Sequence, residues 1–158
     1  MRKLTFAVAA TLFSVVAFGR IVNMDKVGIV MDVPDRFVVK DGGTILAQQI
    51  AYLYMDRSTG ANINVIKQPK TLSLEAFKNV SVEQYKKLNA KVNKMEVNKE
   101  KNTIDIEVEM NMLMLGVKQT TFQKVLVVNN SFVIVSCTAF KPEDSAVMRK
   151  VVATVRRK

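Results

Sequence analysis

Three acidic side chains, Asp105, Glu107 and Glu109, stand at alternate positions, a spacing that puts neighbouring carboxylates on one face of a β-strand. Such a row can bind a cation or a basic partner. It is also the one pattern in the chain that offers an enzyme without histidine a set of paired carboxylates. Cross-strand pairing with nearby lysines accounts for the row without any ligand, and this is the preferred interpretation.

The common catalytic arrangements are missing from the sequence. There is no histidine, so Ser-His-Asp and Cys-His sites are excluded, and a metal site would lack its commonest ligand. The single Cys137 cannot close an intramolecular disulfide, and nothing beside it would activate the thiol. We therefore expect Cys137 to be a small buried hydrophobe, and we predict that the protein is not an enzyme and uses no cofactor.

Two further motifs suggest ligands but have simpler explanations. Met110, Met112 and Met114 alternate along the chain, and thioethers are ligands for soft copper in exported proteins. Two of these methionines continue the apolar face of a predicted strand, so we favour core packing and predict no metal site. The pair Gly42-Gly43 lacks the spaced glycines and the Lys-Ser/Thr of a phosphate-binding loop, so it predicts a turn.

The 158-residue chain is strongly basic, with a formal net charge of +10. Nucleic acid, anionic lipid, cell-wall polymer and acidic proteins all attract such a charge. The basic residues are scattered, so solubility through like charge is the preferred interpretation, and no nucleic-acid binding is expected. The candidate partner contacts lie on two predicted helices and at the chain's basic end, where plain solvation of an exposed face is the alternative: Lys86, Lys87, Arg149, Lys150 and Arg156.

Residues 1–19 have the pattern of a secretory signal peptide. Arg2 and Lys3 give a positive start, an apolar stretch follows, and Ala17 and Gly19 put small residues at the positions that precede a cleavage site. An uncleaved anchor or a buried helix is the alternative, but the stretch is short for a membrane span, which needs about 20 apolar residues. We predict cleavage near Gly19, a periplasmic or secreted protein, and a single domain over residues 20–158.

The central feature of that domain is a predicted hairpin. Ile50–Met55 and residues 61–67 are rich in β-branched and aromatic residues, and the turn formers of residues 56–60 join them. Gly60 accepts the positive φ that such a turn needs. A helix begins near Ser73, and we expect it to lie across the hairpin and to be interrupted in its middle, at Asn79 and Ser81.

The remaining elements follow from alternation and turn chemistry. The clearest alternation, Thr103–Met112, predicts an antiparallel strand with one solvent-facing side that pairs with residues 94–98. Asn129-Asn130-Ser131 predicts the turn of a second hairpin. Three further elements are expected: a first strand over residues 26–33, a short strand from Phe37, and a closing helix from Pro142 with a basic back and end.

This order of elements resembles the PsbP-like/Mog-type fold, including the DcrB-like bacterial envelope proteins. The matching motifs are Gly28 to Pro34 with Phe37, the turn 56–60 that leads into residues 61–65, Ser73-Leu74-Glu75, and Gln123 ahead of residues 132–138. The closing helix departs from the pattern, because Ala153-Thr154-Val155 stands where members of the family often have Ser-Phe.

The resemblance implies an α+β fold, with an antiparallel sheet of about six strands and helices packed on its faces. Relatives serve as an extrinsic photosystem subunit, a Ran-binding nuclear factor, envelope proteins linked to phage uptake, and chaperones for secreted toxins, and most of them act by binding another protein. We therefore expect an exported, non-enzymatic protein-interaction module of the cell envelope. The alternative is a peripheral binder of anionic lipid or envelope polymer that acts through its basic surface.

Overall fold

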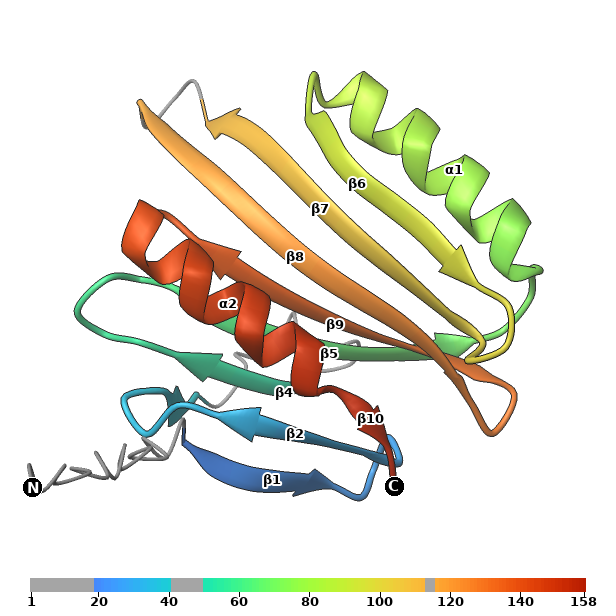
Figure 1. Cartoon of the computed structure of the whole chain (residues 1–158), viewed down its shortest axis with the longest axis horizontal. Helices are drawn as coiled ribbons and strands as arrows, with labels where there is room; N and C mark the ends of the chain where they lie inside the picture. Colours follow the sequence, from blue (N-terminus) through green and yellow to red (C-terminus); the bar gives the residue numbers. More distant parts are fainter. Residues whose placement is uncertain (1–18, 41–49, 113–115) are drawn as a thin grey trace, which may run out of the picture.

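The computed structural model describes residues 19–40, 50–112 and 116–158, and it confirms the α+β architecture (Figure 1). A seven-stranded antiparallel sheet has the order β3-β4-β5-β9-β8-β7-β6, and a three-stranded sheet has the order β1-β2-β10. The elements are β1 Arg20–Met24, β2 Ile29–Val33, β3 Val38–Val39, β4 Ile50–Met55, β5 Asn62–Pro69, α1 Leu74–Lys87, β6 Lys91–Asn98, β7 Thr103–Met112, β8 Val117–Val128, β9 Ser131–Ala139, α2 Pro142–Thr154 and β10 Arg156–Arg157. The predictions for residues 1–18, for Gly42-Gly43 and for Met114 lie outside the described residues.

Both predicted hairpins are confirmed. In the β4–β5 turn, the Asp56 amide donates to the Ala61 carbonyl at 2.9 Å, and Gly60 has a φ of 76°. In the β8–β9 turn, Asn129 and Asn130 have φ values of 46° and 56°. Two consecutive left-handed residues match the right-handed twist of the flanking strands, and asparagine tolerates that conformation better than most residues.

Helix α1 covers β6 and β7 (Figure 1), so the expectation that it lies across the β4–β5 hairpin was wrong. The reason is the match of apolar surfaces. Leu74, Phe77 and Tyr85 of α1 pack on a cluster of buried β7 side chains that includes Ile104 and Ile106. The helix thereby buries one side of the β6–β7 half of the sheet.

The predicted interruption of α1 was also wrong, because the helix runs unbroken over Leu74–Lys87. The Ser73 side chain caps its start by accepting from the Ala76 amide at 3.1 Å. Ser81 is buried and its hydroxyl donates to the Phe77 carbonyl at 2.9 Å, so its polar atom is satisfied inside the helix.

Helix α2 and the small sheet lie on the opposite side of the large sheet. They contribute Met148, Val151 and Met31 to the main core, which also contains Val135 and Cys137 of β9. Helix α2 contacts β2, β8 and β9. The large sheet is therefore covered by different helices on its two sides, and the two helices lie over different strands (Figure 1).

The first strand differs from the prediction for residues 26–33, since β2 begins only at Ile29. Gly28 has a φ of 71°, and the Val27 and Gly28 amides both donate to the Met24 carbonyl, so the residues before Ile29 form a turn. This turn connects β2 to β1, an antiparallel partner that the sequence did not indicate.

The basic end of the chain had been predicted to belong to the closing helix, and this was wrong. Helix α2 ends at Thr154, and Arg156–Arg157 form β10, which pairs with β2. The Arg157 guanidinium donates to the carbonyls of Lys101 at 2.7 Å and Val127 at 2.9 Å. These bonds attach the end of the chain to the turns of the large sheet.

Candidate functional site

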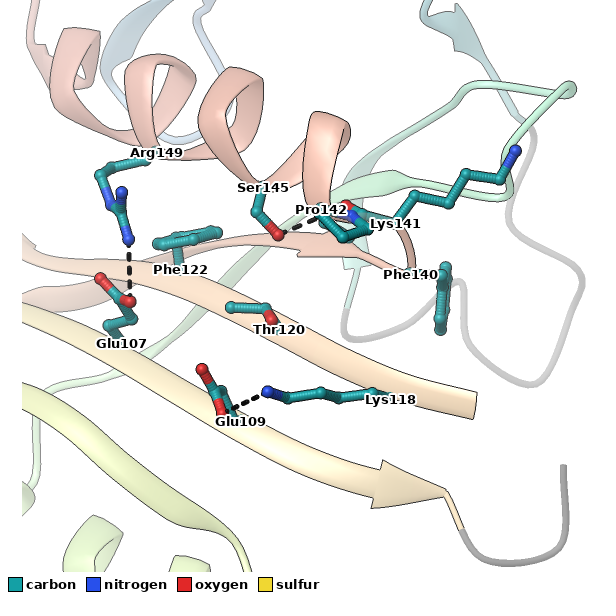
Figure 2. Close-up of a pocket in the computed structure, with 11 residues that line it drawn as sticks. Glu107, Glu109, Lys118, Thr120, Phe122, Phe140, Lys141, Pro142, Ser145 and Arg149 are labelled. Carbon is teal, nitrogen blue, oxygen red and sulfur yellow. Dashed lines mark hydrogen bonds and ion pairs between the residues drawn. The ribbon is translucent and has the colours of Figure 1, made fainter. Parts of the chain in front are cut away.

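A pocket of about 290 Å³ lies between the first half of α2 and strands β7 and β8 (Figure 2). It forms where α2, which rests on β8 and β9, leaves the adjoining strand β7 partly open. Its lining includes the apolar side chains of Phe122, Phe140 and Pro142 and the hydroxyl groups of Thr120 and Ser145. The pocket thus combines an aromatic surface with polar groups on one open side of the sheet.

Two members of the carboxylate row of β7, Glu107 and Glu109, line this pocket, and Asp105 lines a neighbouring cavity. Each member pairs with a cation: Asp105 with Lys124 at 3.6 Å, Glu107 with Arg149 at 2.9 Å, and Glu109 with Lys118 at 2.8 Å. The preferred interpretation, cross-strand pairing with nearby lysines, is confirmed for Asp105 and Glu109, whose lysines lie on β8. It was wrong for Glu107, because its partner is an arginine of helix α2.

The predicted solvent-facing side of β7 is only partly open to solvent. The side chains of Glu107 and Glu109 are only 20% and 25% exposed. The reason is tertiary: α2 places Arg149 over the strand, and Lys118 extends across from β8 (Figure 2). Hydrogen bonds from the side chains of Lys118 and Asn93 lower the pKa of Glu109, so this carboxyl stays ionised at neutral pH.

Arg149 contacts both a carboxylate and an aromatic ring of the pocket. Its guanidinium donates to Glu107 at 2.9 Å and lies over the Phe122 ring, 5.0 Å from the ring centroid. A second cavity of about 310 Å³, towards Val152 and Ala153, shares Glu107, Phe122 and Arg149 with the first. The Arg149–Glu107 pair therefore separates two cavities along the same side of the sheet.

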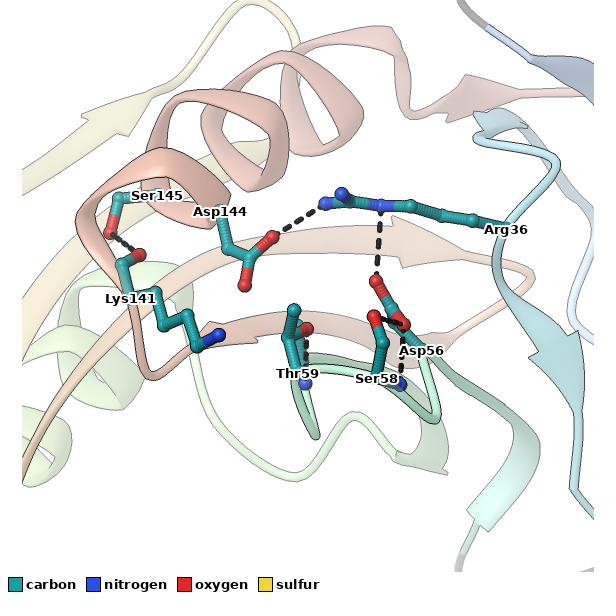
Figure 3. A network of polar contacts seen from close by, with 8 residues as sticks. Arg36, Asp56, Ser58, Thr59, Lys141, Asp144 and Ser145 are labelled. Atoms are coloured by element: carbon teal, nitrogen blue, oxygen red, sulfur yellow. Dashed lines mark hydrogen bonds and ion pairs between the residues drawn. The ribbon is translucent and has the colours of Figure 1, made fainter.

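A second polar cluster lies beneath the start of α2 (Figure 3). Arg36 donates to Asp144 at 2.5 Å and lies 3.2 Å from Asp56, and both carboxylates are buried. Asp56 also accepts from the Ser58 amide and hydroxyl, and these bonds, with the Arg36 charge, lower the pKa of Asp56. Since Asp56 and Asp144 are 3% and 0% exposed, the two carboxylates are closed to substrates, and the cluster serves to fix the first turn of α2 at the pocket.

Sequence reasoning missed this cluster. In the sequence, Asp144 is an acidic residue just after Pro142, where a carboxylate suits the start of a helix, and it does occupy the first turn of α2. Its partner Arg36 is 108 positions away, between β2 and β3. No local pattern connects two such positions, so only the folded chain shows the contact.

The five predicted partner contacts do not form one surface. Lys86 and Lys87 lie in the last turn of α1, Arg149 and Lys150 lie on α2 on the other side of the sheet, and Arg156 lies in β10. Among the five, only Arg149 lines the pocket of Figure 2. Their role in partner binding stays a prediction.

Other chemistry is limited within residues 19–40, 50–112 and 116–158. Cys137 is fully buried, and this burial raises the pKa of its thiol far above the usual range. No group of three or more Cys, Asp or Glu side chains in these ranges could hold a metal ion, and none of their helices has the length and apolar character to cross a membrane.

Comparisons with known proteins identify the fold. No family model matches the chain, and no curated protein sequence is detectably similar to it. The Ran-binding protein Mog1p of Saccharomyces cerevisiae aligns with a TM-score of 0.61 at 11% identity, over 87% of this chain and 94% of Mog1p. The cyanobacterial PsbP of Synechocystis aligns with a TM-score of 0.63 at 12% identity, over 88% of this chain and 92% of that protein.

A third similar structure is LpqN, a protein involved in cell envelope biogenesis of Mycobacterium tuberculosis. It aligns with a TM-score of 0.55 at 15% identity, over 80% of this chain and 81% of LpqN. At these identities the likeness establishes a common fold, and the chain has the Mog1/PsbP-like fold.

Proposed function

We propose that the protein is an exported, non-enzymatic protein-interaction module of the cell envelope, and that its partner binds at the pocket between α2 and β7–β8. The finer relationship to DcrB-like envelope proteins belongs to this proposal, as do cleavage near Gly19 and a periplasmic or secreted location. All of them rest on sequence patterns.

The pocket in Figure 2 is the observation that carries the proposal. Its aromatic floor is buried, with Phe122 only 2% exposed, while the ion pairs around it are accessible to solvent. Aromatic anchors surrounded by polar groups are characteristic of surfaces that bind proteins. The pairs Glu107–Arg149 and Glu109–Lys118 can be rearranged at small cost, because each cation is 61% exposed and ion pairs made by such solvated side chains stabilise a fold weakly.

Two of the similar structures support this proposal by analogy. Mog1p shows that the fold can carry the binding of another protein, and LpqN shows that it occurs in envelope biology. The alternative, binding of anionic lipid or polymer through the basic surface, draws less support, because Lys86 and Lys87 are on the opposite side of the sheet from Arg149 and Lys150.

A cross-linked pull-down tests the proposal. The tagged full chain is recovered from its own envelope fraction, and the bound material is washed at low and at high salt. We expect one stoichiometric protein to survive high salt, because a packed interface persists under conditions that screen surface charge. Lipid or polymer that is lost at high salt would contradict the proposal in favour of the charge-based alternative.

Two matched variants assign the surface. Ser145→Arg places a long cation in the pocket, whereas Asn79→Arg places the same charge on the exposed side of α1. We expect Ser145→Arg to lose the partner and Asn79→Arg to retain it, with unchanged thermal unfolding in both. Retention by Ser145→Arg would show that the pocket is not the binding site.

A further inference from the structure

The pocket already contains a bound cation, supplied by the protein itself. The Arg149 guanidinium lies on the Phe122 ring and bonds to Glu107, while the Arg149 side chain is 61% exposed. Glu107 and Phe122 are direct cross-strand neighbours on β7 and β8, and both are largely buried. The receptor groups are thus fixed in the sheet, and the cation is on a long side chain at the surface of a helix.

A carboxylate beside an aromatic face is a general way to bind a guanidinium or ammonium group. We propose that Glu107 and Phe122 receive a basic side chain, arginine or lysine, from the partner protein, and that Arg149 is an internal occupant which this side chain replaces. This inference rests on the proposed function and specifies the chemistry of the partner at the same pocket.

The neighbouring ion pair extends the same arrangement. Glu109 follows Glu107 on the same face of β7, about 6.7 Å away along the strand, and is paired with Lys118, whose side chain is also 61% exposed. Alternate side chains of an extended peptide have the same spacing. A partner segment with basic residues at alternate positions can therefore replace Arg149 and Lys118 together and leave both carboxylates paired.

The net positive charge of the protein opposes the binding of a basic peptide. With a formal charge of +10, the chain repels basic peptides at long range. Any binding of such a peptide must therefore come from a local site. The same charge would attract an acidic peptide without any specific pocket, so an acidic peptide is the informative control.

The direct test uses the full-length protein and a labelled peptide, Thr-Arg-Thr-Arg-Thr, with binding followed by fluorescence polarisation. Arg149→Ala vacates the site, and Lys99→Ala removes the same charge from the exposed turn between β6 and β7, outside the pocket. We expect Arg149→Ala to tighten peptide binding about 3- to 10-fold, because the internal competitor is gone, and Lys99→Ala to change it less than about 2-fold.

Glu107→Gln provides the opposite change. It removes the carboxylate that would hold the peptide arginine, so we expect it to weaken binding in the Arg149→Ala background. In the unaltered protein, the Nε–H resonance of Arg149 should lose its ring-current shift when the peptide is added, because the guanidinium leaves the Phe122 face.

Several outcomes would overturn the inference: peptide binding that is equal or weaker in Arg149→Ala, an equal gain in Lys99→Ala, or tighter binding of the acidic peptide Thr-Glu-Thr-Glu-Thr at the same pocket. The proposed function is tested separately. If the envelope partner is lost with Ser145→Arg while the basic peptide fails to bind, the pocket remains the interface and only the cation-exchange inference falls.

Discussion

Two arginines of this protein contact carboxylates in opposite environments. Arg36 bridges Asp56 and Asp144, which are 3% and 0% exposed, whereas Arg149 contacts Glu107 at the rim of an open pocket (Figures 2 and 3). The chemical groups are the same. What differs is whether water can replace the arginine when it leaves, and this decides whether the contact serves stability or can be exchanged for a partner.

The buried contact holds the framework of the site. Removing its arginine would take the paired charge away from two buried carboxylates and would leave Asp56 with only its hydrogen bonds from Ser58. Asp144 is in the first turn of the helix that borders the pocket. The exposed contact has the opposite property, because Glu107 can be solvated once Arg149 moves away. The comparison predicts large stability effects at the first site and small ones at the second.

The largest expected effect is that of Arg36→Ala. We expect the free energy of unfolding to fall by about 3 kcal/mol, near the lower end for a broken buried pair because the Arg36 side chain is itself 44% exposed. Urea unfolding followed by circular dichroism measures this change. A loss similar to that of a surface variant such as Lys150→Ala would show that the two arginines do not differ.

The buried cluster around Arg36 should also make the stability of the protein depend on pH, through Asp56. Hydrogen bonds from Ser58 and the charge of Arg36 lower the pKa of Asp56 below its ordinary 3.8. The associated stability is therefore present above pH 3.8 and is lost as the pH falls through the folded-state value.

The measurement compares how steeply the free energy of unfolding falls with pH in the parent and in the variant Asp56→Asn. Urea unfolding of the parent and of Asp56→Asn between pH 7 and about pH 3 should give a flatter acid limb for the variant, whatever its absolute stability. Parallel curves would mean that Asp56 is not the source of the acid sensitivity.

The smallest expected effect on stability is that of Arg149→Ala. We expect a loss below about 1 kcal/mol, since the Arg149 side chain is 61% exposed, Glu107 lines an open pocket where water can replace the arginine, and the cation–π contact adds little in water. Unfolding of Arg149→Ala beside Lys150→Ala measures it. A loss as large as that of Arg36→Ala would make Arg149 a structural residue and would remove the basis for its exchange.

Local chemistry made much of the fold predictable. The turns at Gly60 and at Asn129-Asn130 need left-handed residues, and the alternation of Thr103–Met112 needs a two-sided strand, so each could be identified without tertiary information. Strand β1 was missed because its residues are largely exposed, which leaves only a weak alternation to detect.

The site itself was only partly predictable. The carboxylate row was visible in the sequence, and so was Arg149 as a candidate contact. The contact between Arg149 and Glu107 was not visible in the sequence. The two residues are 42 positions apart and are brought together by the packing of α2 on β8 and β9. The aromatic floor was hidden for the same reason, since Phe122 reads as an ordinary core residue of β8.

Site-specific photo-cross-linking in the native envelope shows directly whether the partner binds beside α2 on the β7 side of the sheet. A photoreactive residue replaces Ser145 in one protein and Asn79 in another, which places the probe in the pocket or on the exposed surface of α1. We predict one discrete cross-linked protein from position 145 and none from position 79. A cross-linked protein from position 79 and none from position 145 would show that the partner does not bind at the pocket.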